Sequence, residues 1–183
     1  MGIGSNVLSG TTLNSSVLGG GASASKSFVL IDRTAGTNIG NMTVSGGLAA
    51  AFDGTTDQAD GSSARFNDVD GWVGKTLAAA RVFGKALVYG TNASGFESGP
   101  NGVNNDTLEI YGKSGTAPSA YNDGTLLATL TFTHNTPDAL YPAGRELDST
   151  DLVSSWDHLW VHVHSGNGGQ VTWCAELQLY AWE

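Results

Sequence analysis

The sequence predicts an all-β fold, an antiparallel β-sandwich of the jelly-roll type that follows an N-terminal extension. Only 14% of the 183 residues are charged and 26 are glycine, which favours strands and turns over helices with charged faces. In residues 159–164, Leu, Val and Val alternate with Trp, His and His, the period-2 pattern of a strand with one buried face. Turn signals such as Asn122–Asp123–Gly124 separate segments of this kind, as in antiparallel sandwiches.

Eight short segments have the composition of strands, with turn residues between most of them. Only residues 148–156 indicate a helical turn, for which Asp148 or Ser149 would be the N-cap. The expected strands are 27–32, 41–45, 72–79, 81–89, 107–111, 126–132, 159–164 and 171–182.

Two regions differ in composition, and we place the boundary between them after residue 46. Residues 1–46 are poor in aromatic residues and rich in Gly, Ser, Thr, Asn and Ala, and residues 19–25 have the composition of a flexible joint. This extension is either a tail followed by the first strands of the domain, or an anchor or oligomerisation segment that orders against a partner. Residues 47–183 are expected to form the sandwich domain.

Charge and hydropathy narrow the range of partners. The net charge of −9 disfavours nucleic acid, because phosphates repel an acidic surface. No apolar run approaches the roughly 20 residues that a membrane-spanning helix needs, and no basic amphipathic helix indicates binding at a membrane surface. The N-terminus lacks the basic and apolar regions of a secretory signal. We therefore expect neither a nucleic-acid nor a membrane partner.

No group of residues matches a catalytic motif. The sequence contains no Gly-x-Ser-x-Gly elbow, no His-Glu-x-x-His pair and no phosphate-binding glycine loop before Lys-Ser/Thr. We therefore expect binding rather than catalysis. The single cysteine, Cys174, lies in the apolar run 171–175 and has no second cysteine for a disulfide or a thiolate metal site. We expect it to be a small buried residue.

Three histidines, His158, His162 and His164, lie close together in the sequence. The last two would share one face of a strand, and such a pair can bind zinc. No third ligand at metal spacing is evident, although Asp157 or His134 could approach in space. The favoured alternative is a solvent-facing or inter-subunit sheet surface.

Six motifs occur in order between residues 47 and 183. The first is an apolar-Asp-Gly turn at Phe52–Asp53–Gly54, and the last is an Ala-Glu-apolar strand at 175–180. This series resembles the discoidin/coagulation-factor-type C domain, also called galactose-binding-like, which implies a jelly-roll sandwich. The particular residues in these motifs resemble the versions found in bacteriophage structural proteins, including head decorations, head fibres and tail-tip proteins. The four motifs between the ends are 71–76, 87–92, 108–115 and 156–161.

The resemblance also implies a structural calcium ion that ties the first loop of the domain to its last strand. Asp53 and Glu176 would be carboxylate ligands, and calcium accepts backbone carbonyl oxygens beside them. The alternative is an Asx turn at Asp53, with Glu176 paired to a lysine or arginine. The other implied ligands are Thr55, Asp57, Gln58 and Ala175.

Sugar binding uses aromatic platforms together with planar polar side chains on loops. Arg65 and Arg145 could donate paired hydrogen bonds to hydroxyls or acidic sugars. Aromatic residues on strands will mostly be core, as we expect for Trp72, Trp160 and Tyr180. The preferred glycan-binding candidates are Arg65, Phe66, Phe96, Tyr141 and Arg145, and Trp72 and Trp173 are weaker ones.

Together, these features predict a non-enzymatic virion surface protein, a head decoration, head fibre or tail component. It would carry a carbohydrate-binding-like domain for assembly or for attachment to bacterial surface glycans. The expected partners are other virion proteins, reached through the N-terminal segment, further copies of this chain in a homo-oligomer, and a cell-surface glycan. It would be made in the host cytoplasm without a signal peptide. The alternative is a stand-alone carbohydrate-binding module or an accessory domain of a polysaccharide depolymerase.

Overall fold

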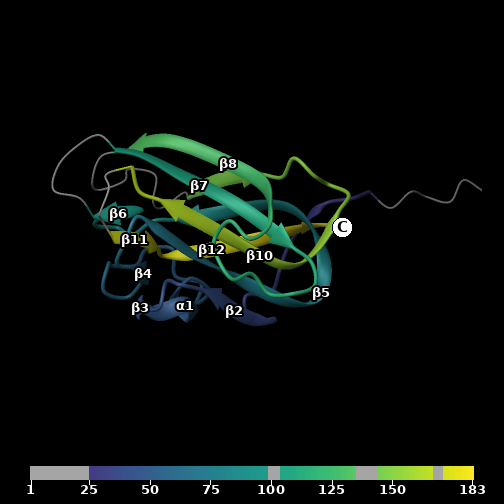
Figure 1. The fold of residues 1–183 in the computed structure, drawn as a ribbon, viewed down its shortest axis with the longest axis horizontal. Helices are drawn as coiled ribbons and strands as arrows, with labels where there is room; N and C mark the ends of the chain where they lie inside the picture. Colours follow the sequence, from purple (N-terminus) through teal and green to yellow (C-terminus); the bar gives the residue numbers. More distant parts are fainter. Residues whose placement is uncertain (1–24, 99–103, 135–143, 167–170) are drawn as a thin grey trace, which may run out of the picture.

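The computed structural model describes residues 25–98, 104–134, 144–166 and 171–183, and it confirms the predicted all-β sandwich (Figure 1). A large curled sheet has the strand order β1-β12-β5-β10-β7-β8, with β2 and β9 added by pairing to β5, and a smaller sheet has the order β3-β4-β11-β6. The large sheet contains β1 (Phe28–Leu30), β2 (Thr37–Gly40), β5 (Asp70–Tyr89), β7 (Asn104–Lys113), β8 (Thr125–His134), β9 (Arg145–Asp148), β10 (Ser155–His164) and β12 (Glu176–Trp182). The small sheet contains β3 (Val44–Ser45), β4 (Ala64–Phe66), β6 (Glu97–Ser98) and β11 (Val171–Cys174).

The longest element is β5, which runs without a break where the sequence predicted two strands. Its first half pairs with β10 and β2, and its second half pairs with β12 and β9. The register with β10 shifts between Trp156 and His158, an irregularity of the kind that bends a strand. Because both halves share β5, one sheet wraps around the core.

The core lies against the face of β10 that carries Leu159, Val161 and Val163. These three side chains have no exposed surface, as the alternation in the sequence predicted. Burying one such side chain contributes about 1.5–3 kcal/mol, so this cluster supplies much of the stability of the fold. Cys174 is also fully buried, which confirms that prediction. Other fully buried members of the cluster include Met42, Phe83, Val88, Leu108 and Ile110.

The opposite face of β10 carries a second apolar cluster. Trp160 is fully buried between Tyr111, whose ring is stacked on it at a centroid distance of 5.7 Å, and Trp72, which meets it edge-on at 6.0 Å. The Trp160 indole N–H donates to the carbonyl oxygen of Tyr121 at 2.6 Å. Burial of Trp72 and Trp160 confirms the prediction for both, whereas Tyr180 is only half-buried.

Part of the predicted N-terminal extension belongs to the sandwich. β1 pairs with β12, β2 with β5, and β3 with β4. All three partners lie beyond residue 46, so the boundary placed there cuts across both sheets. The described part of the extension therefore supplies the first strands of the domain. Residues 1–24, where most of the expected anchor falls, lie outside the described residues.

Several short elements escaped sequence analysis. The strands β2, β4, β6 and β9 have two to four residues each, too few to show alternation, and pairing with neighbours decides them. The helical turn predicted at 148–156 is wrong, because β9 ends there and a loop leads into β10. In that loop Asp151 accepts hydrogen bonds from the backbone N–H groups of Val153 and Ser154. The described residues contain one short helix, α1 (Gly47–Ala50), and none with the length and hydropathy to cross a membrane.

Candidate functional site

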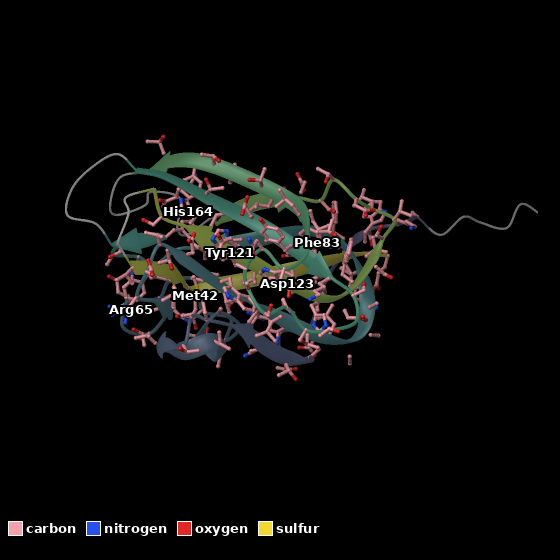
Figure 2. All side chains as sticks on the ribbon, in the orientation of Figure 1. Met42, Arg65, Phe83, Tyr121, Asp123 and His164 are labelled. Carbon is pink, nitrogen blue, oxygen red and sulfur yellow. The ribbon has the colours of Figure 1, made fainter. Side chains whose placement is uncertain are left out.

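Arg65 of β4 and Trp173 of β11 are neighbours in the small sheet, at one end of the sandwich (Figure 2). The guanidinium carbon of Arg65 lies 4.9 Å from the centre of the Trp173 ring, within the range of cation–π attraction. Trp173 is only 4% exposed. Arg65 Nε and Trp173 Nε1 are both buried, and no described residue accepts a hydrogen bond from either. Arg65 is itself only half-buried, so a ligand at the surface meets its guanidinium and not these two buried atoms.

A line of contacts connects this pair to a second arginine. The backbone N–H of Trp173 donates to the carbonyl oxygen of Phe96 at 2.9 Å, and the Phe96 ring meets Phe132 of β8 edge-on at 5.6 Å. The guanidinium carbon of Arg145 lies 4.1 Å from the centre of the Phe132 ring. We call Arg65, Trp173, Phe96, Phe132 and Arg145 the arginine–aromatic row. Its two guanidinium groups are planar donors of the kind that bind hydroxyls and carboxylates in pairs.

The structure brings three of the five preferred glycan candidates, Arg65, Phe96 and Arg145, into this row. Phe96 is 1% exposed, so its ring supports the row from the core side and does not reach the surface. Phe66 follows Arg65 in β4 and therefore faces the other way, where it packs against the core. Tyr141 lies outside the described residues.

The predicted calcium loop is closed by its own hydrogen bonds. Asp53 Oδ1 accepts from the backbone N–H of Thr55 at 2.8 Å, which makes an Asx turn. Gln58 Nε2 lies 2.8 Å from each oxygen of the same carboxylate. Gln58 is 4% exposed, and its Oε1 is buried without a donor among the described residues. Asp57 Oδ1 accepts from the Asn92 side chain at 2.8 Å. The loop thus offers calcium one amide oxygen that the protein leaves unpaired.

Glu176, the second predicted carboxylate, is fully buried at the start of β12. Its Oε2 accepts from the backbone N–H of Gly54 at 3.0 Å, and its Oε1 lies 3.2 Å from Nη1 of Arg33. Burial raises the pKa of Glu176 above its ordinary value, and the hydrogen bonds from Gly54 and Arg33 only partly offset this. Sequence analysis did not single out Arg33, which lies 143 positions away from its partner.

These contacts decide how a calcium ion fits the predicted ligands. Each oxygen of Glu176 already faces a protein donor, and the guanidinium of Arg33 provides positive charge at this carboxylate. A calcium ion bound to Glu176 would therefore have to displace Arg33. The observed arrangement is the alternative considered above, an Asx turn with Glu176 paired to an arginine. A calcium site formed by Asp53, Thr55, Asp57, Gln58, Ala175 and Glu176 stays a prediction.

The histidines of β10 lie on the face that carries Trp160. His158 and His162 are each 3% exposed, so the expectation of a solvent-facing surface is wrong for both. His158 Nε2 lies 2.9 Å from the carbonyl oxygen of Gly115, and the segment between β7 and β8 thereby covers this face. Asp70, which sequence analysis did not connect with the histidines, lies within reach of His162 and His164.

Comparison with known proteins identifies the fold. No family model matches the sequence, and no curated protein matches it. Among solved structures, the family 32 carbohydrate-binding module of AlyQ in complex with 4,5-unsaturated mannuronic acid is 9% identical, with a TM-score of 0.56 over 82% of this chain and 97% of the module. The family 32 module of NanJ from C. perfringens, in complex with galactose, is 15% identical, with a TM-score of 0.55 over 84% and 98%. An F5/8 type C domain from Bacteroides fragilis is 14% identical, with a TM-score of 0.55 over 85% and 97%. At these identities the likeness concerns the fold alone, which is that of the galactose-binding-like β-sandwich domains.

Proposed function

We propose that this protein is a non-enzymatic carbohydrate-binding domain that holds a glycan at the arginine–aromatic row. The similarity of the fold to solved structures supports this proposal, since the similar modules of AlyQ and NanJ were solved with sugars bound. The observation that carries the proposal lies within the chain: Arg65 and Arg145, both half-buried, each place a guanidinium on an aromatic ring of the row.

The chemistry of the row favours an acidic glycan. The oxygens of a sugar accept hydrogen bonds from planar donors, and the guanidinium groups of Arg65 and Arg145 are the planar donors of this row. A guanidinium matches the geometry of a carboxylate and binds it in a bidentate manner, which a neutral donor does not. Arg65 and Arg145 therefore select a uronic acid or a similar carboxylate-bearing sugar over a neutral one.

The direct test is binding to a panel of acidic and neutral oligosaccharides, followed by calorimetry on those that bind. We expect the wild-type protein to bind an acidic glycan and Arg65→Ala to bind it at least about tenfold more weakly, a loss of roughly 1.4 kcal/mol. Trp173→Phe keeps a six-membered aromatic ring beside Arg65 but loses the indole N–H and the five-membered ring, so its affinity should fall by less than that of Arg65→Ala. Arg65→Lys keeps the charge but loses the planar donor pair and should not restore binding.

Arg81→Ala is the matched control, because Arg81 is an exposed arginine that pairs with Glu183 outside the row. It should bind the glycan as the wild type does. Failure of the folded wild-type protein to bind any glycan on the panel would refute the function. Wild-type affinity in Arg65→Ala would refute the position of the site.

The narrower role, on the surface of a virion, is a further proposal that rests on the resemblance of the motifs to phage structural proteins. A stand-alone module, or an accessory domain beside an enzyme, is equally compatible with the fold, and one similar solved structure contains both the AlyQ module and an alginate lyase domain. Localisation of the protein in a reconstructed particle tests the virion role. Deletion of residues 1–24 tests whether an anchor precedes the strands, since attachment should be lost while the domain still folds.

A further inference from the structure

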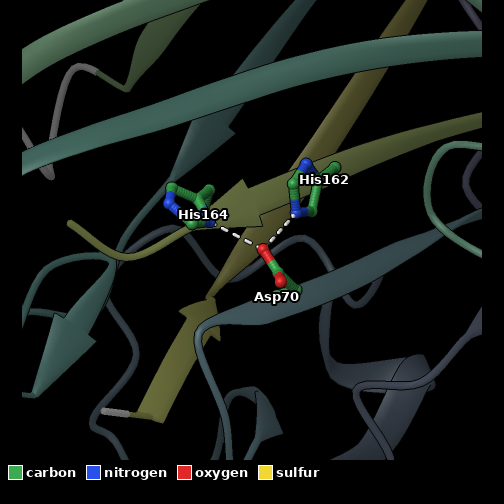
Figure 3. A group of neighbouring side chains, drawn as sticks. All are labelled: Asp70, His162 and His164. Atoms are coloured by element: carbon green, nitrogen blue, oxygen red, sulfur yellow. Dashed lines mark hydrogen bonds and ion pairs between the residues drawn. The ribbon is translucent and has the colours of Figure 1, made fainter. Parts of the chain in front are cut away.

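Asp70, His162 and His164 form a cluster where β5 begins and β10 ends (Figure 3). Asp70 Oδ1 lies 2.6 Å from His164 Nδ1 and 3.0 Å from His162 Nε2. One ligand-type atom from each residue lies within 4.8 Å of the other two. The sheet register accounts for this, since His164 is the Cα partner of Asp70 and His162 lies two residues earlier on the same face.

A second carboxylate holds His162 from the opposite side. Glu109 of β7 is the Cα partner of His162, and its Oε2 lies 2.9 Å from His162 Nδ1. The hydroxyl of Tyr111 donates to the same oxygen at 2.9 Å, and burial together with this contact raises the pKa of Tyr111 to about 12, so it stays a donor. The ring of Tyr121 stacks on His162 at a centroid distance of 4.0 Å. The imidazole is therefore fixed in orientation.

The hydrogen-bonding capacity of His162 shows that this cluster needs another positive charge. Both ring nitrogens face carboxylate oxygens, but a neutral imidazole has only one N–H. If Nδ1–H donates to Glu109, the lone pair of Nε2 points at Asp70, which is also an acceptor. The His162 side chain is 4% exposed, so water does not screen this repulsion. A metal ion between Nε2 and Asp70 removes it.

We propose that Asp70, His162 and His164 bind one zinc ion through Oδ1, Nε2 and Nδ1. Two imidazoles and one carboxylate form a donor set that suits zinc, whereas calcium and magnesium prefer oxygen ligands. In a tetrahedral zinc site with bonds of about 2.0–2.2 Å, the ligand atoms lie about 3.3 Å apart. Asp70 Oδ1 lies 2.6 and 3.0 Å from the two ring nitrogens, so these atoms would move apart slightly to admit the ion. Glu109 sets the tautomer of His162 and its orientation, as carboxylates do behind metal-bound histidines.

The site is open on one side, because 45% of the His164 side chain and 32% of the Asp70 side chain are exposed. Three protein ligands leave the fourth position of a tetrahedral ion for water or an oxygen of a bound molecule. The ion would also join the start of β5 to the end of β10, two strands that the chain places far apart in sequence. This proposal does not depend on glycan binding.

The test is calorimetric titration of the full-length, tag-free, chelator-treated protein with zinc chloride at about pH 7.5, where an unperturbed histidine is mostly neutral. We expect one zinc ion per chain and a melting temperature that rises with zinc but not with magnesium. His164→Ala removes an exposed ligand and should weaken binding at least about a hundredfold while the protein stays folded. Glu109→Gln should weaken it by about 10–100-fold, the usual effect of a carboxylate behind a metal-bound histidine.

Two controls separate this site from others. Asp148→Asn makes the same charge change as Asp70→Asn at an exposed position of β9, and it should keep wild-type zinc affinity while Asp70→Asn loses it. Asp53→Ala, in the predicted calcium loop, should also leave zinc binding unchanged. Absence of a one-to-one zinc signal from the folded wild type would overturn the proposal, and so would equal affinity in His164→Ala.

Discussion

Arg33 holds the fully buried carboxylate of Glu176, with Nη1 3.2 Å from Oε1. Gly54 lies directly against this contact, since a Cβ atom at this position would lie 2.3 Å from the same Nη1, and its φ of +89° favours glycine. The backbone N–H of Gly54 then donates to the other oxygen of Glu176. The guanidinium of Arg33 therefore helps to link three segments of the chain. These are the connection between β1 and β2, the loop that contains Asp53, and the last strand, β12.

Arg33→Ala should lower the free energy of unfolding by about 1–3 kcal/mol, because it leaves a buried carboxylate oxygen without a donor. Arg33 is itself partly exposed, with 36% of its side chain accessible, so the loss should fall below that of a pair buried on both sides. Urea denaturation measures it. The control is Arg81→Ala, which breaks an exposed pair with Glu183 and should change little. Equal free energies of unfolding in the two variants would show that the Arg33 contact stabilises the fold no more than an exposed ion pair does.

A calcium ion at the predicted site would compete with Arg33 for the same oxygen of Glu176, so removal of Arg33 should favour the ion. We expect Arg33→Ala to bind calcium more tightly than the wild-type protein in calorimetry after chelation. Asp53→Ala in the same background should abolish that signal, since it removes the carboxylate of the loop. If neither protein gives heat with calcium, the predicted metal site is wrong and the Asx turn is the whole arrangement.

The long strands could be predicted from the sequence because their own alternation encodes them. In β10 every second residue, Leu159, Val161 and Val163, enters the core, and a local pattern suffices to show it. The burial of His158 and His162 could not be predicted in this way. It depends on the segment between β7 and β8, which folds over the outer face of the sheet. No period-2 pattern reports such a contact.

The candidate sites also contain residues that their own chemistry identifies and residues that only tertiary contacts reveal. Arg65 and Arg145 were identified from the chemistry of their side chains, and the structure places both on aromatic rings. Asp70 and Arg33 were missed, because they meet their partners across 94 and 143 positions of sequence. Only the sheet register and the packing of the first strands bring them there, and neither can be deduced from single residues.

Gly74 is the Cα partner of Trp160, and the two strands approach closely at this point. A Cβ atom on Gly74 would lie 2.2 Å from the carbonyl oxygen of Leu159 and 2.3 Å from Trp160 Cβ. Because backbone atoms cannot yield without moving the strand, Gly74→Ala should lower the free energy of unfolding by about 1–3 kcal/mol. In the control, Gly61→Ala, the added methyl meets nothing within 4 Å and should change stability by less than about 0.5 kcal/mol. Matching denaturation curves would contradict the close approach.

Cys174 should be inert in the folded protein. It is fully buried, and burial raises the pKa of its thiol well above the ordinary value of 9.0, while the thiolate is the form that reacts. A thiol reagent at mildly alkaline pH should therefore label the protein only after a denaturant is added. Rapid labelling of the native protein would show that the core opens around β11.

Asp123 should make the stability of the domain sensitive to acid. Hydrogen bonds from the Lys113 ammonium and from the backbone N–H of Ser119 lower its pKa from 3.8 to about 2. A carboxyl group whose pKa is lower in the folded state stabilises the fold above its unfolded pKa, and that contribution is lost as the pH falls toward the folded value. The free energy of unfolding should therefore fall less steeply in Asp123→Asn than in the wild type between about pH 4 and about pH 2. Asp148→Asn, which changes an exposed aspartate of β9, should keep the wild-type slope.

A local probe can show whether the loop that contains Asp123 opens first in acid. The carbonyl oxygen of Tyr121, in the same loop as Asp123, accepts the indole N–H of Trp160, so the NMR signal of that N–H reports the state of the loop. An unchanged signal throughout would place the acid-sensitive contact elsewhere.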